Sequence, residues 1–260
     1  MKIVVLMKQV ANKDAVLRIG KDAKWIDETD TAYETNESDG YALEESLRLK
    51  EAKGGGEVIV CSLGPNRVKT VIKDALARGA DRAIHIVVED VNTMSPFQIA
   101  KTLAEAVKDE QPDLVMSGLQ SDDNGYGQTG VILAELLGIP HATLVIEIDR
   151  ETVNGKIRLK RELESGWYQW FTYQTPALLT IQSGISQIRY ASLKGIMAAK
   201  KKEIKEVTPS SDATSFDSRQ EIEKIYFPLK MKQTQMLGAG DAKRGAAELI
   251  EKLRAEVRIF

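Results

Sequence analysis

The sequence predicts an α/β protein built around a doubly wound, mostly parallel sheet. Short apolar runs alternate with amphipathic helical segments through the first two thirds of the chain. Continuous apolar runs are typical of parallel strands that are buried on both faces, and a repeated strand–helix–strand order implies right-handed crossovers. The length of 260 residues is enough for one large domain, or for one domain with a substantial extension.

The first half of the chain supplies the parallel layer. The predicted strands are Ile3–Met7, Val58–Leu63, Ala83–Val88 and Leu114–Ser117. The helices predicted between and after them are Ser38–Ala52, Arg67–Arg78, Pro96–Lys108 and Gln128–Leu137. Ser95 is a good N-cap for the third of these helices, and Gly138 with Pro140 ends the fourth.

After Pro140 the pattern changes to strands without helices between them. We expect His141–Ile148, Lys156–Arg161, Trp167–Tyr173 and Ala177–Gln182 to extend the sheet with antiparallel strands. A helix over Arg189–Lys202, a polar linker over 203–220 and a final helix over Ala242–Arg258 follow. The sequence thus predicts an α/β domain over 1–188, a separate segment over 189–202, and a C-terminal arm over 203–260. The last helix either packs on a partner subunit or folds back on its own domain.

Composition excludes several classes of protein. The 36 Lys and Arg residues nearly balance 38 Asp and Glu residues, which argues against nucleic-acid binding. A single cysteine, Cys61, excludes a disulfide framework, and no apolar run approaches the ~20 residues of a membrane span. The chain begins with a strand pattern in place of a signal peptide, so we expect a cytoplasmic protein, or a mitochondrial matrix protein whose leader has been removed.

Motifs for side-chain catalysis are missing from the sequence. It contains no P-loop, no nucleophile elbow and no His-Glu-x-x-His metal motif. His85 and Cys61 stand inside apolar runs, and His141 begins a strand, so packing roles are expected for all three. We therefore expect no enzymatic chemistry from side chains and no metal site.

The segment Gly118–Gly130 is the strongest candidate for a ligand site. It follows a strand and opens a helix, so it lies at the edge of the sheet where α/β folds bind ligands. Its glycines let the backbone approach a ligand, and free N–H groups at the helix N-terminus can hold a phosphate. Asp122 and Asp123 would repel a phosphate, so we expect them to face hydroxyls, water or solvent. The alternative is an ordinary long surface loop.

Two further loops are expected at the same edge of the sheet. They are Asn36–Asp39, which precedes a helix and offers Asn36 or Ser38 as a cap, and the turn Ser62–Pro65. Elsewhere, the aromatic run Trp167–Tyr173 indicates a strand buried on both sides or one at a subunit interface. Gly238–Gly240 follows no strand and is interpreted as the lead-in to a helix.

Several motifs spread along the chain resemble those of the electron transfer flavoprotein β subunit. The resemblance includes the opening strand that ends in Met7-Lys-Gln-Val10, the Asn36-led turn and the loop from Gly118 to Gly130. It also includes Arg161-Glu162 followed by Thr175-Pro-Ala-Leu-Leu-Thr180. Arg189-Tyr-Ala-Ser-Leu-Lys-Gly-Ile-Met197 with Lys200–Lys202 is the most specific stretch.

This resemblance implies an adenine-nucleotide-hydrolase-like fold and a heterodimeric electron carrier. An α subunit would hold most of the FAD, and the C-terminal arm of this chain would pack on it. Electrons would arrive from flavoprotein dehydrogenases and leave to an acceptor oxidoreductase. A structural AMP would bind this subunit. The residues implied to contact AMP are Leu6, Asn36, Glu37, Ser38, Asp39, Leu63, Gly118, Leu119, Gln120, Ser121, Asp122, Asp123, Asn124, Gly125, Tyr126, Gly127, Gln128 and Thr129. The segment 189–197 corresponds to the family's dehydrogenase-recognition loop, with Leu193 as its apolar anchor and Arg189, Tyr190, Ile196 and Met197 beside it.

Two alternatives stay open. The chain could be the β subunit of an electron-bifurcating relative, with a second FAD where AMP would lie, although Asp122-Asp-Asn-Gly125 resembles the AMP type. It could also be a stand-alone nucleotide-binding α/β protein. Lys13 and Ser38 stand where many relatives have aromatic residues that approach the flavin.

Overall fold

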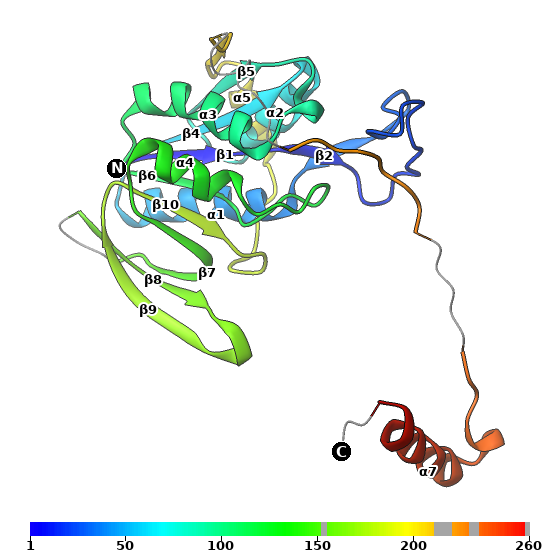
Figure 1. The fold of residues 1–260 in the computed structure, drawn as a ribbon. Helices are drawn as coiled ribbons and strands as arrows, with labels where there is room; N and C mark the ends of the chain where they lie inside the picture. Colours follow the sequence, from blue (N-terminus) through cyan, green and yellow to red (C-terminus); the bar gives the residue numbers. More distant parts are fainter. Residues whose placement is uncertain (152–154, 211–219, 229–233, 258–260) are drawn as a thin grey trace. The chain divides into compact units, whose positions relative to one another are not determined.

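The computed structural model describes residues 1–151, 155–210, 220–228 and 234–257 (Figure 1). The chain divides into two compact units, Met1–Ile225 and Tyr226–Phe260. The larger unit is built on a nine-stranded sheet in the order β11-β5-β4-β1-β6-β10-β7-β8-β9. This architecture confirms the predicted α/β fold with a doubly wound, mostly parallel sheet.

The centre of the sheet consists of the predicted parallel strands. These are β1 (Lys2–Leu6), β4 (Glu57–Gly64), β5 (Arg82–Val87) and β6 (Leu114–Gly118). In β1, Ile3 and Val5 belong to one apolar cluster and Val4 and Leu6 to the other, and all four are buried. A strand with both faces buried needs apolar residues at every position, which is why the run is continuous.

Helices cover both faces of the sheet (Figure 1). On one face lie α1 (Glu37–Ala52), α2 (Lys69–Arg78) and α5 (Leu193–Ala199). On the other lie α3 (Pro96–Glu110) and α4 (Thr129–Leu137). As predicted, Ser95 caps α3: its hydroxyl accepts from the backbone N–H of Gln98, and the Gln98 side chain accepts from the backbone N–H of Ser95.

The prediction of four antiparallel strands after Pro140 is half wrong. β10 (Ala177–Ile181) inserts between β6 and β7 (His141–Asp149) and is parallel to both. Only β8 (Lys156–Glu162) and β9 (Tyr168–Gln174) are antiparallel, and they form the far edge of the sheet. Because no helix separates these strands in sequence, their pattern is that of an antiparallel meander. In the structure, the chain instead returns after β9 and adds β10 beside β6.

Short elements were missed because their patterns are weak. β2 (Gln9–Ala11) and β3 (Tyr33–Thr35) pair in a small antiparallel sheet. β11 (Ile204–Val207) lies parallel to β5, so the first part of the expected linker belongs to the main sheet. The 3₁₀ turns are η1 (Asn66–Val68), η2 (Val91–Thr93), η3 (Glu164–Gly166) and η4 (Gly238–Gly240).

The helix predicted over Arg189–Lys202 is shorter in the structure. Ser192 caps α5 by accepting from the backbone N–H of Gly195, so residues 189–192 precede the helix. The final helix, α7, spans Ala242–Lys252 and continues as a π turn, η5, over Leu253–Val257, while Arg258 lies outside the described residues. η4 leads directly into α7, which confirms the interpretation of Gly238–Gly240.

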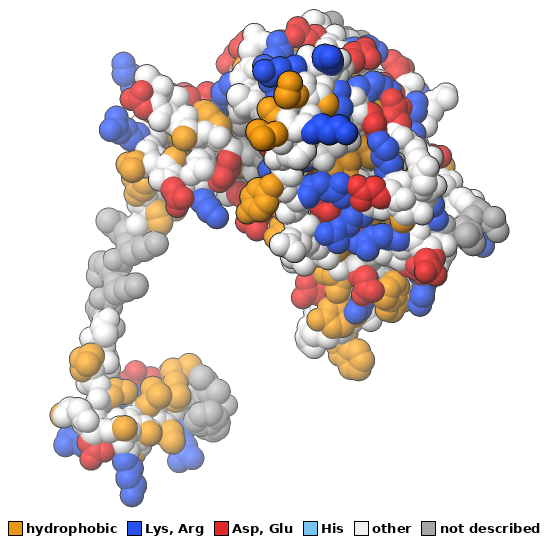
Figure 2. Space-filling view, turned by 180° about the vertical axis from the view of Figure 1, so that it is seen from behind, with side chains coloured by type: hydrophobic (Ala, Val, Ile, Leu, Met, Phe, Trp, Pro, Cys, Tyr) orange, Lys and Arg blue, Asp and Glu red, His pale blue; other side chains and the backbone are white. Residues whose placement is uncertain are grey.

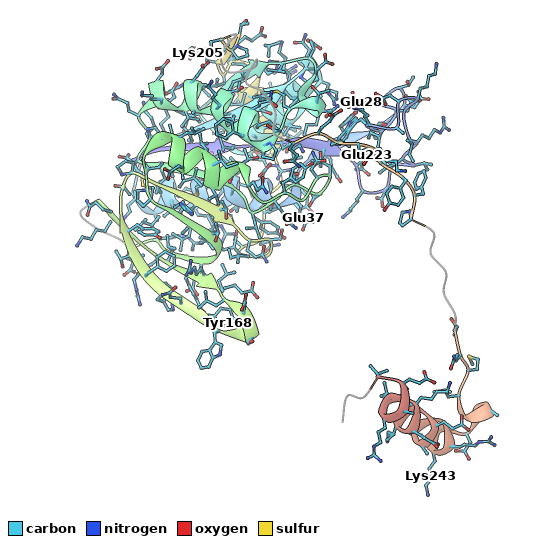
Figure 3. The ribbon with its side chains drawn as sticks, viewed as in Figure 1. Glu28, Glu37, Tyr168, Lys205, Glu223 and Lys243 are labelled. Carbon is cyan, nitrogen blue, oxygen red and sulfur yellow. The ribbon has the colours of Figure 1, made fainter. Side chains whose placement is uncertain are left out.

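The aromatic strand β9 is not buried on both sides. Its side chains alternate between two faces: Phe171 and Tyr173 pack on the core, while Tyr168 and Trp170 lie on the opposite face. Trp167 is 72% exposed and Tyr168, which Figure 3 labels on the β8–β9 hairpin, is 53% exposed. A role at a subunit interface stays a prediction.

Candidate functional site

One cleft lies at the edge of the sheet where the parallel strands end. Its volume, including the space open to solvent, is about 850 Å³. Residues at or just after the ends of β1, β4 and β6 line it together with the start of α1, among them Lys8, Leu63, Leu119 and Asn36. The three loops that the sequence placed at one edge do meet there.

The first turn of α1 holds the loop that follows β6. The side-chain amide of Asn36 donates to the Gln120 carbonyl (3.0 Å), and its oxygen accepts from the backbone N–H of Asp122 (2.9 Å). The Ser38 hydroxyl also donates to the Gln120 carbonyl (2.8 Å). Asn36 is at the N-cap position but makes no side-chain cap bond, because its side chain is used on the loop instead.

The two aspartates of the loop are exposed, which agrees with the expectation that they face solvent, and both also bind protein groups. Asp122 accepts from the backbone N–H of Glu37 at 3.0 Å, so it supplies the cap that Asn36 does not. Asp123 accepts from the Lys8 ammonium at 2.6 Å and from the backbone N–H of Asn124 at 2.6 Å. Both carboxylates thus fasten the loop to its neighbours.

Asp39 is a buried carboxylate at the base of the cleft. It accepts from the backbone N–H of Lys8 and from that of Gly118, each at 2.7 Å. Burial raises the pKa of Asp39 to about 6, against the opposing effect of these two hydrogen bonds. Its carboxylate ties the ends of β1 and β6 to α1.

The backbone between β6 and α4 has the geometry expected of a ligand loop. Gly125 and Gly127 have φ values of 62° and 61°, which a side chain would strain. None of the side chains that the structure describes caps the N-terminus of α4 at Gln128. The N–H groups of the first turn of α4 are therefore open to an anion, and the loop can approach it closely.

The cleft also has an apolar wall that the sequence reasoning missed. It is formed by Val91, Met94, Pro96, Ile99 and Leu103. These residues follow β5 and begin α3. Ligand sites in α/β folds form from the loops at the ends of the parallel strands. Applying that rule to the loop after β5, as to the other three loops, would have indicated Val91.

The structure distributes the residues implied for AMP binding into two groups. Those that line the cleft are Leu6, Asn36, Asp39, Leu63, Gly118, Leu119, Gln120, Ser121, Asn124, Tyr126, Gly127, Gln128 and Thr129. Glu37, Ser38, Asp122, Asp123 and Gly125 lie beside the cleft without lining it. Of these, Ser38 and Asp122 support the loop through the hydrogen bonds given above.

A second feature is an apolar surface on and before α5. Tyr190, Leu193, Ile196 and Met197 are 94%, 83%, 45% and 71% exposed. Figure 2 shows hydrophobic side chains set among those of Lys and Arg on the visible face of the larger unit. Arg189 differs from the other four residues because its guanidinium pairs with Glu44 and Glu51 of α1. We call Tyr190, Leu193, Ile196 and Met197 the α5 patch.

The side chains in the described part of the chain do not form a metal site. It has no group of three His, Cys, Asp or Glu side chains placed to hold a metal ion. His85 is fully buried with its Nε2 2.9 Å from the Gly64 carbonyl oxygen, and burial raises the pKa of the Cys61 thiol to about 12. None of the described helices is long and apolar enough to cross a membrane.

Fold and site together define an α/β protein with a cleft where its parallel strands end and an exposed apolar surface. The family model of the electron transfer flavoprotein domain matches residues 24–212. An electron transfer flavoprotein subunit beta of Methylophilus methylotrophus is 36% identical over 258 residues, covering 96% of this chain and 97% of the relative. The mitochondrial subunit beta of Arabidopsis thaliana is 34% identical over the whole of both chains, and the human subunit beta is 31% identical over 88% of this chain and 89% of its own. The chain belongs to the electron transfer flavoprotein β-subunit family, whose members are electron-transfer proteins.

Proposed function

We propose that this chain is the β subunit of a heterodimeric carrier that takes electrons from flavoprotein dehydrogenases to an acceptor oxidoreductase. In this proposal it has no side-chain catalysis of its own, and it acts in the cytoplasm or in a mitochondrial matrix. The FAD that carries the electrons is held mainly by the α subunit. Support for this role comes from family membership over nearly the whole chain and from the α5 patch, which suits a protein that docks transiently.

We further propose that the cleft holds AMP. The observation that carries this proposal is the uncapped N-terminus of α4 at the mouth of the cleft. A phosphate would accept from N–H groups of Thr129 and Gly130, while the adenine ring would pack on the apolar wall near Met94 and Ile99. Asn36, Asp39 and Lys8 would keep the loop closed around the ligand. AMP would then stabilise the folded subunit without entering the redox reaction.

The nucleotide content of the purified heterodimer tests this assignment. The chain is co-expressed with its α subunit, the complex is purified and denatured, and the released nucleotides are quantified. One FAD and one AMP per heterodimer are expected. Two FAD and no AMP would make this cleft a second flavin site and the complex an electron-bifurcating one. A stable chain that binds AMP but does not associate with the α subunit would instead favour a stand-alone nucleotide-binding protein.

The C-terminal unit is proposed to pack on the α subunit. The helix α7 carries Leu249 and Ile250, which are 48% and 45% exposed, and none of its described residues is buried. A helix with an exposed apolar side gains stability from a partner surface. Deleting residues 226–260 is expected to abolish co-purification with the α subunit while the larger unit stays folded.

A further inference from the structure

The segment in front of the α5 patch is held by one stripe of α1. Residues Gly40, Glu44, Arg48 and Glu51 recur at helical spacing and so share a side of the helix. The Arg48 guanidinium donates to the Gln187 carbonyl at 2.9 Å, and a Cβ added at Gly40 would lie 3.3 Å from the Ile188 side chain. Segment 187–189 therefore lies along α1.

Glu44 is the centre of this contact. Its side chain is only 3% exposed, yet it accepts from the backbone N–H of Arg189 (3.1 Å), from the Arg189 guanidinium (2.9 and 3.2 Å) and from Arg48 (2.6 Å). Burial would raise the pKa of Glu44, but the hydrogen bonds from Arg189 and Arg48 outweigh it and hold the pKa below its ordinary value. Arg189 is further clamped by Glu51 at 2.5 and 3.1 Å.

The far side of the patch is fixed to α2. A Cβ at Gly195 would overlap the carbonyl oxygen of Ala77, so α5 lies directly against the C-terminal end of α2. The Lys202 ammonium donates to the carbonyls of Leu76 and Ala80 at 2.8 and 2.5 Å. Contacts of Arg189 before α5, of Gly195 within it and of Lys202 after it thus hold the backbone that carries the exposed side chains in place.

We propose that Glu44 and Arg189 are positioning residues that hold the α5 patch in the conformation its partner binds. This inference rests on the proposed docking function, and it assigns to Arg189 a role inside the subunit instead of a contact with the partner. A short helix of seven residues would be frayed in isolation. Ordering it before binding lowers the entropy cost of association, so the network raises affinity without touching the partner.

The first measurement is hydrogen exchange on the heterodimer. In Glu44→Gln, amides of residues 190–199 are expected to exchange at least about ten times faster than in the unaltered complex. The control is Glu45→Gln on the same helix. Glu45 is also buried and also paired with an arginine, Arg150 at 2.9 Å, but that arginine follows β7. Equal exchange of residues 190–199 in the two variants would overturn the positioning role.

The second measurement is steady-state reduction of the heterodimer by whichever purified flavoprotein dehydrogenase reduces the unaltered complex fastest. Glu44→Gln and Arg189→Gln are expected to raise KM for the heterodimer by about five- to tenfold with kcat within about twofold, since only the docked conformation is lost. Glu44→Asp should restore part of the KM. Gly195→Ala, which displaces α5 without removing a charge, should reproduce the KM effect.

The two measurements separate the failure of this inference from failure of the proposed function. Faster exchange at 190–199 with an unchanged KM would overturn the link between the network and docking. If no dehydrogenase reduces the unaltered heterodimer, the proposed function fails, whereas exchange still decides whether Glu44 orders the patch.

Discussion

The carboxylate of Asp39 accepts a 2.7 Å hydrogen bond from the backbone N–H of Gly118, and this bond joins the N-terminal turn of α1 to the end of β6. The same carboxylate accepts from Lys8 at the end of β1. A single buried side chain therefore sets the spacing of three elements around the cleft. Both the stability of the subunit and the shape of the cleft depend on it.

The stability of the protein should depend on the ionisation of Asp39. Its pKa in the folded state, about 6, is above the ~3.9 of an unfolded chain, so the folded state binds the proton more tightly. The contribution of Asp39 to the free energy of unfolding is therefore largest below about pH 4 and falls, by roughly 2–3 kcal/mol, as pH rises to about 6. Other groups titrate in the same range, so the informative quantity is the difference from Asp39→Asn.

Denaturant unfolding of both proteins across this pH range checks the prediction. The stability of the unaltered protein relative to Asp39→Asn should decline with rising pH. A difference that stays constant across the range would show that the carboxyl does not titrate with a raised pKa.

The close approach at Gly118 predicts a loss of nucleotide on substitution. A Cβ at this position would lie 2.6 Å from Asp39 Oδ1 and would also overlap the Ser38 side chain. Gly118→Ala should push β6 away from α1, open the loop and lower the AMP content of the purified heterodimer several-fold, a cost of about 1–3 kcal/mol. Gly245→Ala is the control, because its Cβ would meet nothing closer than 3.5 Å. Full AMP content in Gly118→Ala would contradict this account of the site.

Leu193 should matter for docking and not for folding. Its side chain is 83% exposed, which removes the alternative that it is a core residue of the subunit. Leu193→Ala should raise KM for the heterodimer in reduction by its dehydrogenase by roughly 5–30-fold, which corresponds to about 1–2 kcal/mol of lost interface energy, with FAD and AMP content and melting temperature unchanged. The control is Leu136→Ala, an apolar residue of α4 that is 40% exposed away from the patch. Equal KM values in the two variants would contradict the docking role.

Residues could be placed from the sequence where a local pattern decides the structure. The apolar runs around Val4 and Val60 predicted buried parallel strands, and the strand-end rule brought Asn36, Leu63 and Gly118 to one cleft. Most of the candidate site follows from that one rule.

The remainder depends on contacts between distant parts of the chain. Nothing local indicates that Ala177–Ile181 inserts beside β6, or that Asp122 caps α1 from 85 residues away. Arg189 was expected in the docking surface because the segment 189–197 resembles the family's recognition loop, and its pairing with Glu44 spans 145 residues. That Glu44 is the partner of Arg189 can be seen only in the folded structure, where α1 and the segment before α5 lie side by side.

The charge around the α5 patch predicts a salt-dependent encounter. Lys194, Lys200 and Lys201 are exposed in and after α5, so a partner with an acidic rim would be steered toward the patch. The association rate with the dehydrogenase should fall as ionic strength rises, because the Debye length shortens from ~10 Å at 0.1 M salt to ~3 Å at 1 M. Replacing Lys200 and Lys201 by Gln should flatten this dependence while the dissociation rate changes little.

Lys202→Gln is the informative comparison: Lys202 is bound to α2 carbonyls, so its loss should lower stability and leave the salt dependence intact. Stopped-flow association at several salt concentrations distinguishes these results, and a slope unaffected by the double substitution would show that the patch is not steered by charge.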